Sequence, residues 1–317
     1  MPDATPDKRH DAATAAKATK VQRVDDNTYV VDLSPAFNIG AVPNGGYVAG
    51  HFLAVALAHV AERHGHRHVI AAHWDFLGRS RPGRGTMAVD ELKVARNMSV
   101  LRIALYQDDS ELWVARRRPV IVASVTCRDT ATETGPSLDG GCAPRSPVPA
   151  ADLALLPLGR DPGWARYEAR NFRRNRHWHM YEPRSSAGGP AGVRDTWVEY
   201  QSGERITNLD LPYLADVTPA ICAHGLQQAA AGGADVPASW YPTLNIHMDF
   251  KKSLPADGVR WLRLRTSVRA ARNGRYGCDV DVFDADGDLV AQARHVAMIV
   301  DMSRNTANQT TSKLTNL

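Results

Sequence analysis

Long apolar runs are missing from this sequence of 317 residues. None approaches the roughly 18 consecutive apolar residues that a membrane-spanning helix needs. The first residues lack the apolar core of a secretory signal, and the final Thr-Asn-Leu does not match the Ser-Lys-Leu peroxisomal address. We therefore expect a cytoplasmic protein without a membrane span.

Cysteine is scarce, and the common cofactor motifs are absent. The four cysteines form no C-x-x-C pair, so neither a disulfide framework nor a cysteine zinc site is indicated. The chain has no Walker loop, G-x-G-x-x-G fingerprint or G-x-S-x-G elbow, which leaves nucleotide, dinucleotide and α/β-hydrolase chemistry without support. His64, His66 and His68 are spaced like a short metal tract but have no carboxylate partner. We expect no metal and no cofactor.

A large excess of one charge is also missing. The 38 Lys and Arg residues stand against 34 Asp and Glu residues, for a net charge of +4. This excess is too small for the basic footprint of a nucleic-acid-binding protein, so we expect no nucleic-acid partner. The densest basic cluster runs from Arg166 to His179 and includes aromatic residues. It could clamp an adenine nucleotide, or it could form the charged outer face of a strand.

Composition divides the chain into two comparable parts. Residues 130–163 are rich in proline and small residues, which predicts a linker. Residues 1–20 and 303–317 are polar and have no hydrophobic period, which predicts disordered tails. The two folded parts are therefore expected at residues 21–129 and 164–302.

These two parts repeat each other. His73-Trp74-Asp75-Phe76 returns as His247-Met248-Asp249-Phe250, and Ala95-Arg96-Asn97 returns as Ala271-Arg272-Asn273. Chance rarely keeps short matches in the same order and nearly in register. We therefore predict an internally duplicated domain.

Each repeat combines one helix with several strands. Residues 46–61 are apolar helix formers ended by Arg63-His64-Gly65, and residues 219–231 are their counterpart, with Pro219 in the first turn. Turns are expected at Asp108-Asp109 and at Asp284 to Gly287. The expected strands cover residues 69–76, 87–95, 100–107, 112–126, 241–250, 261–269, 277–284 and 289–301. A helix followed by an antiparallel meander, repeated once, indicates an α+β fold in which each helix is buried against a sheet.

Three local motifs resemble the TesB-type acyl-CoA thioesterases, a family of double hot-dog proteins. They are Pro43-Asn-Gly-Gly-Tyr-Val-Ala-Gly50, His73-x-Asp75-Phe76 with Arg81-Pro-Gly83, and Asp286-Gly-x-Leu-Val-Ala291. The resemblance covers about residues 25–302, apart from the linker. It implies a double hot-dog fold, with two tandem antiparallel sheets each wrapped around a central helix.

The resemblance also implies three working residues. In this family an Asp at the start of the second helix, a Ser or Thr on the next strand and a Gln on the last strand orient a water molecule. By motif, the Asp corresponds to Asp216, the hydroxyl to Thr243, and the glutamine position holds His295.

The residues themselves leave several interpretations open. Ahead of a helix, Asp216 is either a simple N-cap or a carboxylate kept ionised by the helix dipole, and the resemblance favours the second interpretation. Thr243 is either an ordinary strand residue or a hydroxyl that fixes the water. His295 is either a satisfied histidine or a group that orients the water or takes its proton.

The start of the first helix supplies the candidate substrate-binding residues. The turn Asn44-Gly45-Gly46 offers backbone amides that suit a thioester oxygen or a phosphate, or it is ordinary turn chemistry. Tyr47 and Trp74 are candidates for the lining of an acyl tunnel, although large aromatic residues are often plain core.

The sequence therefore predicts an acyl-CoA thioesterase-like hydrolase whose substrate is acyl-CoA or a carrier-bound acyl thioester. Two alternatives stay open at this point: a tailoring enzyme acting on a polyketide-type acyl intermediate, and a non-catalytic acyl-binding protein. Homo-oligomerisation is an expectation from the family.

Overall fold

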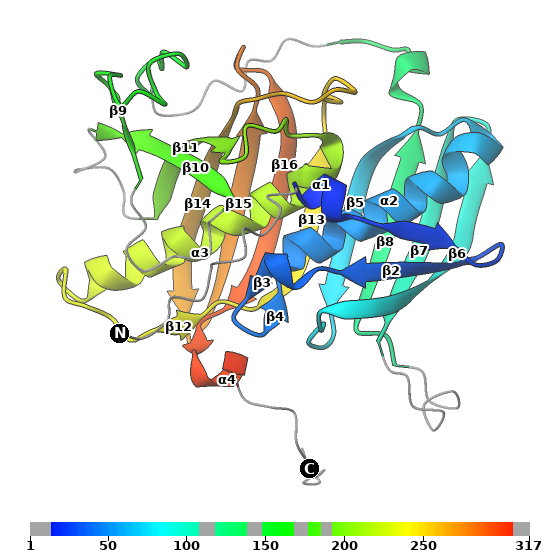
Figure 1. Ribbon diagram of the computed structural model, residues 1–317, viewed down its shortest axis with the longest axis horizontal. Coiled ribbons are helices and arrows are strands. Elements are labelled where there is room, and N and C mark those ends of the chain that lie inside the picture. Colours follow the sequence, from blue (N-terminus) through cyan, green and yellow to red (C-terminus); the bar gives the residue numbers. More distant parts are fainter. Residues whose placement is uncertain (1–13, 108–117, 138–147, 168–176, 185–191, 307–317) are drawn as a thin grey trace, which may run out of the picture.

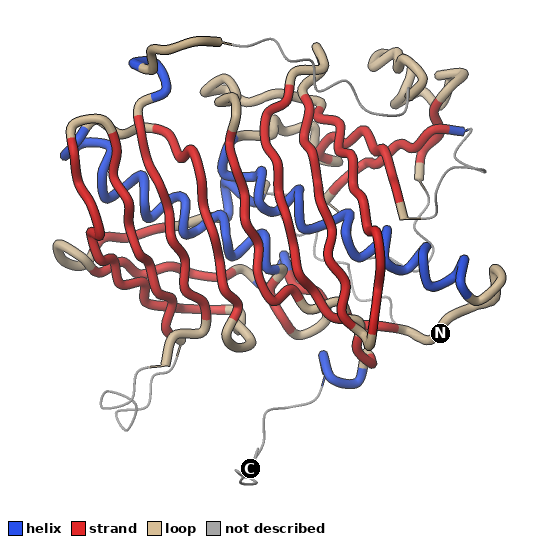
Figure 2. The backbone as a smooth tube through the Cα atoms, turned by 180° about the vertical axis from the view of Figure 1, so that it is seen from behind, coloured by secondary structure: helices blue, strands red, loops and turns tan. Residues whose placement is uncertain are grey.

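The computed structural model describes residues 14–107, 118–137, 148–167, 177–184 and 192–306. One antiparallel sheet of 13 strands dominates these residues, and two long helices lie on one of its faces (Figures 1 and 2). The helices are α2 (Gly45–His64) and α3 (Leu211–Ala230), which contact each other and the sheet. Two short helices, α1 (Ala15–Ala18) and α4 (Ser303–Thr306), lie near the ends of the described chain.

The sheet order mirrors itself about its centre. It runs β1-β2-β6-β7-β8-β5-β13-β16-β15-β14-β11-β10-β9. The strands of the first half are β1 (Val21–Arg23), β2 (Thr28–Leu33), β5 (His68–Phe76), β6 (Gly83–Ala95), β7 (Met98–Tyr106) and β8 (Ile121–Arg128). Those of the second half are β9 (Trp164–Arg166), β10 (Trp178–Pro183), β11 (Val193–Tyr200), β13 (Thr243–Phe250), β14 (Leu262–Arg272), β15 (Arg275–Phe283) and β16 (Leu289–Met298). Two separate ribbons pair β3 (Asn38–Ile39) with β4 (Val42–Pro43), and β12 (Ser239–Trp240) with β17 (Val300–Asp301).

The duplication is visible in the register of the strands. The halves join where β5 pairs with β13, and in this pair His73 lies directly opposite His247. Both strands carry a bulge at the same place, between Val69 and Ala71 in β5 and between Thr243 and Asn245 in β13. The predicted α+β double hot-dog architecture is therefore confirmed.

The first long helix forms much as its sequence predicts. The side chain of Asn44 caps it by accepting a hydrogen bond from the Tyr47 backbone N–H, and Gly65 ends it in the left-handed region at φ 71°. Twelve of its 20 residues are buried, because α2 packs against strands β5, β7 and β8 and also against α3. A helix that is apolar on nearly every side is typical of such a position.

The second long helix begins earlier than predicted. It starts at Leu211 rather than Pro219, so Pro219 lies inside it and Asp216 lies in its second turn instead of before it. A proline inside a helix costs roughly 3 kcal/mol. The buried residues of the first two turns, including Leu211, Leu214 and Val217, offset this cost by packing against the core.

Parts of the expected tails and linker are packed against the fold. Asp210 is fully buried and accepts a hydrogen bond from Ala16 N at 2.8 Å, which fastens α1 to the start of α3. In the expected linker, Leu156 is buried in a small cluster with Trp164 and Trp197. The local sequence does not indicate these contacts because the buried partners Asp210 and Trp197 come from distant segments of the chain. The domain boundaries themselves stay predictions.

One of the two expected turns lies within the described residues. Asp284 to Gly287 connects β15 and β16, where the Asp284 carboxylate accepts hydrogen bonds from the backbone N–H groups of Asp286 and Asp288. Gly287 has a φ of 91°, which favours glycine. Asp108-Asp109 lies outside the described residues.

Candidate active site

A cavity of about 230 Å3 opens where the two halves meet. From the first half, the β3–β4 ribbon, the first residue of α2 and the end of β5 line it. From the second half, α3, the segment from β12 to the start of β13, and residues of β15 and β16 line it. Its walls therefore depend on how the two repeats pack against each other.

Asp216, Thr243 and His295 meet in this cavity. The Thr243 hydroxyl donates a hydrogen bond to Asp216 Oδ1 over 3.0 Å. His295 Nδ1 lies 3.6 Å from the same oxygen. The three residues come from α3, β13 and β16, so the fold assembles a set that the sequence analysis could only bring together through a family resemblance.

The carboxylate of Asp216 is held by the other repeat's helix. Asp216 Oδ2 accepts a hydrogen bond from Gly46 N, 2.9 Å away, in the first turn of α2. The positive end of a helix dipole stabilises an anion at this position. The expectation that the dipole of α3 plays this part is wrong, because Asp216 lies inside α3 rather than ahead of it.

The imidazole of His295 is buried yet faces the cavity residues. The side chain is 1% exposed, and neither ring nitrogen has a hydrogen-bond partner among the described residues. Buried polar atoms are usually paired, so an exception calls for an explanation. Here the ring nitrogens are available to a molecule held in the cavity next to Asp216.

At the positions equivalent to Thr243 and His295, the described part of the first repeat has apolar side chains. The register of β5 with β8 and of β13 with β16 makes Val69 the counterpart of Thr243 and Val125 the counterpart of His295. Valine can neither donate nor accept a hydrogen bond through its side chain. Among the described residues, this constellation therefore lies in the second half of the duplicated fold.

The predicted substrate-binding residues divide into two groups. Gly45 lines the cavity, Gly46 donates to Asp216, and Asn44 lines the cavity while capping α2. Tyr47 and Trp74 instead belong to the hydrophobic core, with no exposed surface, and neither lines the cavity. Their proposed place in an acyl tunnel is wrong, because both side chains are covered by the packing of the helices and the sheet.

Sequence reasoning missed most of the cavity wall. Phe37, Tyr213, Trp240, Tyr241 and Tyr276 line the cavity together with the imidazole of His177. These residues come from several separate segments and share no motif. Their only sequence signal is aromatic character, which they share with ordinary core residues.

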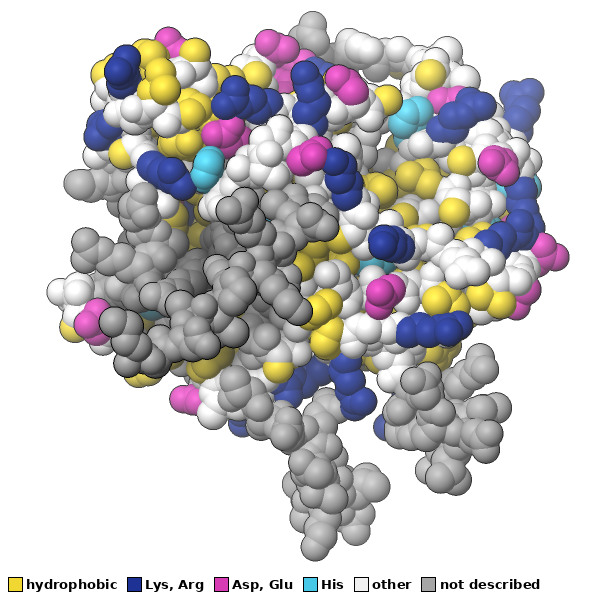
Figure 3. Space-filling model, in the orientation of Figure 1, with side chains coloured by type: hydrophobic (Ala, Val, Ile, Leu, Met, Phe, Trp, Pro, Cys, Tyr) yellow, Lys and Arg dark blue, Asp and Glu magenta, His cyan; other side chains and the backbone are white. Residues whose placement is uncertain are grey.

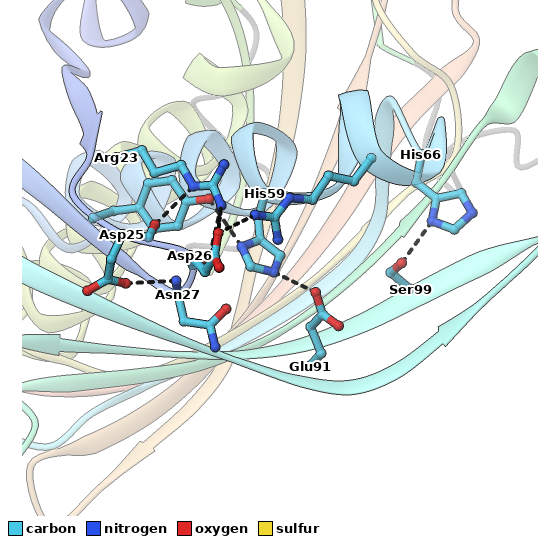
Figure 4. Close-up of polar contacts among 10 residues, drawn as sticks. Arg23, Asp25, Asp26, Asn27, His59, His66, Glu91 and Ser99 are labelled. Carbon is cyan, nitrogen blue, oxygen red and sulfur yellow. Dashed lines mark hydrogen bonds and ion pairs between the residues drawn. The ribbon is translucent and has the colours of Figure 1, made fainter.

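Other polar clusters lie in the first repeat and do not line the cavity (Figure 4). The buried His59 contacts Tyr29 Oη at 3.1 Å and Glu91 Oε1 at 2.8 Å. His66 Nδ1 lies 2.8 Å from the hydroxyl of Ser99, which is fully buried. These contacts fasten α2 and the following turn to strands β6 and β7. Within the described ranges, no group of three or more His, Cys, Asp or Glu side chains is placed to hold a metal ion.

The basic stretch from Arg166 to His179 lies largely outside the described residues, since positions 168–176 are not among them. At its end, His177 lines the cavity, and His179 on β10 lies 3.4 Å from Glu199. Over the described part of the face in Figure 3, acidic and basic side chains are interspersed. No helix in the part of the chain that the structure describes is long and apolar enough to cross a membrane.

Comparison with known proteins agrees with this architecture. A model of the acyl-CoA thioesterase N-terminal domain matches residues 33–128, and one of the C-terminal domain matches residues 143–299. The thioesterase-like protein TwmA of Talaromyces wortmannii is 31% identical, over 96% of this chain and 97% of that protein.

Two solved structures show the same fold. A protein with a hot-dog fold from Alicyclobacillus acidocaldarius superimposes with a TM-score of 0.67 at 16% identity, covering 90% of this chain and 97% of that one. The acyl-CoA thioesterase II TesB2 from Mycobacterium marinum gives a TM-score of 0.62 at 18% identity, covering 88% and 95%.

Proposed function

The chain belongs to the acyl-CoA thioesterase family of thioester hydrolases, and from this premise we propose that Asp216, Thr243 and His295 hold the water that attacks its substrate. The observation that carries the proposal is the convergence of these three side chains on one cavity. The hydroxyl of Thr243 and the imidazole of His295 both lie within 3.6 Å of the same oxygen of Asp216.

In the proposed reaction, the water donates one hydrogen bond to Asp216 and the other to a ring nitrogen of His295. Asp216 takes a proton as the water oxygen attacks the thioester carbonyl carbon. Its own orientation is fixed by the Gly46 N–H and the Thr243 hydroxyl. Breaking the carbon–sulfur bond of the resulting tetrahedral intermediate then gives the acid and a thiolate, which recovers the proton from Asp216.

The start of α2 suits the negative charge that develops on the carbonyl oxygen. Gly45 lines the cavity in the first turn of this helix, close to the Asp216 carboxylate. Backbone amides at a helix N-terminus stabilise an anion without having to reorganise. We therefore place the thioester oxygen towards the first turn of α2 and the attacking water towards His295.

A thiol-release assay over a panel of acyl-CoAs tests the proposal. We expect wild type to hydrolyse at least one thioester. In Asp216→Asn, the rate of thiol release should fall about 100-fold or more, the usual contribution of a general base. Asp249→Asn is the matched control, because this carboxylate lies on β13 outside the cavity and its side chain is 39% exposed. Full activity in Asp216→Asn would contradict the proposed role.

The carrier of the acyl group is part of the same proposal. We take acyl-CoA as the substrate, and an acyl group on a carrier protein presents the same thioester to the cavity. Assaying one acyl group on both carriers separates them, since only the true carrier should combine a low KM with a high kcat. A polyketide-type intermediate would show itself by turnover only when carrier-bound.

A further inference from the structure

The cavity is unusually rich in aromatic residues. Phe, Tyr and Trp make up 7% of the chain but six of the 27 described residues that line the cavity, about three times that share. The six are Phe37, Phe76, Tyr213, Trp240, Tyr241 and Tyr276. A tunnel for a linear alkyl chain needs only aliphatic walls, so this enrichment bears on the acyl group.

Phe37, one of the lining residues, belongs to a preformed stack of rings that continues into the core. Phe37 lies between two nearly parallel rings, with its centroid 4.2 Å from that of Tyr47 and 4.5 Å from that of His177. Tyr213 meets Phe37 edge-on at 83° and a centroid distance of 5.4 Å. Hydrogen bonds hold the outer rings, because Tyr47 Oη accepts from Ser34 N and His177 Nε2 lies 3.0 Å from the Ala36 carbonyl.

Three other aromatic residues of the lining are also held in place. Tyr241 Oη lies 2.7 Å from Gln227 Nε2 on α3, and its ring meets Tyr276 edge-on at 6.3 Å. The guanidinium of Arg79 lies over the Trp240 ring at 5.1 Å. The Arg79 guanidinium also donates to the backbone carbonyl of Asn305. These contacts fix the orientation of the rings before any ligand enters.

We propose that the acyl group carries an aromatic ring, which packs against these preformed rings while its thioester reaches Asp216. The proposal rests on the proposed function, since it names the substrate class of that site. A planar ring gains a directional interaction with aromatic neighbours, equivalent to about 2- to 10-fold per well-placed pair, beyond the burial that any hydrocarbon obtains. A saturated ring or chain gains only the burial.

Two matched thioesters test the substrate class. Phenylacetyl-CoA and cyclohexylacetyl-CoA have the same number of carbons, and in both a methylene separates the ring from the carbonyl, so their intrinsic reactivity is similar. We expect kcat/KM in wild type to favour phenylacetyl-CoA by about tenfold, equivalent to one or two favourable ring contacts. A ratio of one or below with hydrolysis intact would overturn the aromatic proposal and leave the hydrolase proposal standing.

Trp240 offers a matched pair of variants. It is only half-buried on the short strand β12, so replacing it spares the core. We expect Trp240→Leu to move the ratio towards one and Trp240→Phe to keep it above that of Trp240→Leu. Equal ratios in wild type and both variants would remove Trp240 from the proposed binding surface.

Binding without turnover keeps the two proposals distinguishable. The thioethers S-(2-phenylethyl)-CoA and S-(2-cyclohexylethyl)-CoA cannot be hydrolysed, so calorimetry compares the two ring types directly. If wild type hydrolyses neither ring-bearing acyl group on CoA or on a carrier protein but binds the phenyl compound about tenfold more tightly, the substrate class stands and the hydrolytic role of Asp216 fails. Equal affinities overturn the aromatic proposal whatever the activity.

Discussion

The backbone N–H of Gly46 donates a 2.9 Å hydrogen bond to the carboxylate of Asp216, although the two residues are 170 positions apart. The contact exists because α2 and α3 approach closely at this glycine. A Cβ atom at residue 46 would lie 2.1 Å from the Pro212 carbonyl oxygen and 2.7 Å from the Asp216 Cβ. The crossing of the two helices and the position of the candidate base are therefore one structural feature.

Gly46→Ala should damage both stability and activity. The added methyl group has to push the backbone of α3 away, and such overpacking costs about 1–3 kcal/mol of unfolding free energy. The shift also lengthens the Gly46–Asp216 hydrogen bond, so we expect thiol release to fall. Urea denaturation and the thiol-release assay measure the two effects.

Gly225→Ala is the control for that substitution. It lies in α3, where a Cβ atom meets nothing within 4 Å. Alanine in an open helical position should raise the unfolding free energy by about 0.5–1 kcal/mol. Equal behaviour of the two variants would mean that the crossing at Gly46 tolerates a side chain.

Thr243→Val should lower activity with little loss of stability. The substitution keeps the shape of the side chain, removes the hydroxyl that donates to Asp216, and places in β13 the residue that β5 has at Val69. We expect kcat to fall about 10- to 100-fold, at or below the roughly 100-fold lower limit for losing a donor that contacts the transition state, because Thr243 acts through Asp216. Thr243→Ser keeps the hydroxyl and should retain most of the activity. Loss in both variants would point to packing rather than to the hydrogen bond.

His295→Gln distinguishes two roles of the imidazole. If His295 only orients the water, glutamine can accept the same hydrogen bond, and kcat should stay within about tenfold of wild type. In His295→Val, kcat should then fall about 100-fold or more. Steady-state kcat values across pH 5–9 provide the measurement. An inactive His295→Gln would instead assign the proton transfer to the imidazole.

His51 makes stability depend on pH. It is fully buried in α2, and burial lowers the pKa of its imidazole to about 4. The unfolded imidazole binds a proton below about pH 6.5, whereas the folded one does so only below about pH 4. The contribution of neutral His51 to the free energy of unfolding is therefore present above pH 6.5 and is lost as the pH falls towards 4. The loss is about 2 kcal/mol at pH 5 and about 3 kcal/mol in full.

Comparison with His51→Leu isolates this effect from other titrating groups. The difference in unfolding free energy between wild type and the variant should shift by about 2 kcal/mol in favour of the variant between pH 7 and pH 5. Urea denaturation at the two pH values measures it. A difference that is constant with pH would show that the folded protein protonates His51 freely.

The sequence predicted the structural elements whose residues repeat or alternate in a local pattern. The paired His-x-Asp-Phe motifs and the alternating strands led to the duplicated sheet, and apolar residues around Phe52 led to α2. The start of α3 was missed because Pro219 suggests a first turn, whereas burial of Leu211 and Leu214 extends the helix in front of it. A local pattern does not contain that long-range packing.

Only part of the candidate site could be predicted from the sequence. Asp216, Thr243 and His295 were identified through a family resemblance, and their meeting in one cavity depends on the tertiary fold. The role of Gly46 as a donor to Asp216 depends on the crossing of two helices. Trp74 illustrates the converse, because an aromatic side chain looks the same in sequence whether it lines a cavity or fills the core.

The Gly46–Asp216 hydrogen bond also has a consequence for behaviour on dilution. It joins the two repeats, and both belong to one covalent chain. A site shared between separate subunits dissociates as the protein concentration falls, whereas this one is completed by the folding of a single molecule. Its specific activity should therefore stay constant down to nanomolar enzyme, whether or not the chain assembles further.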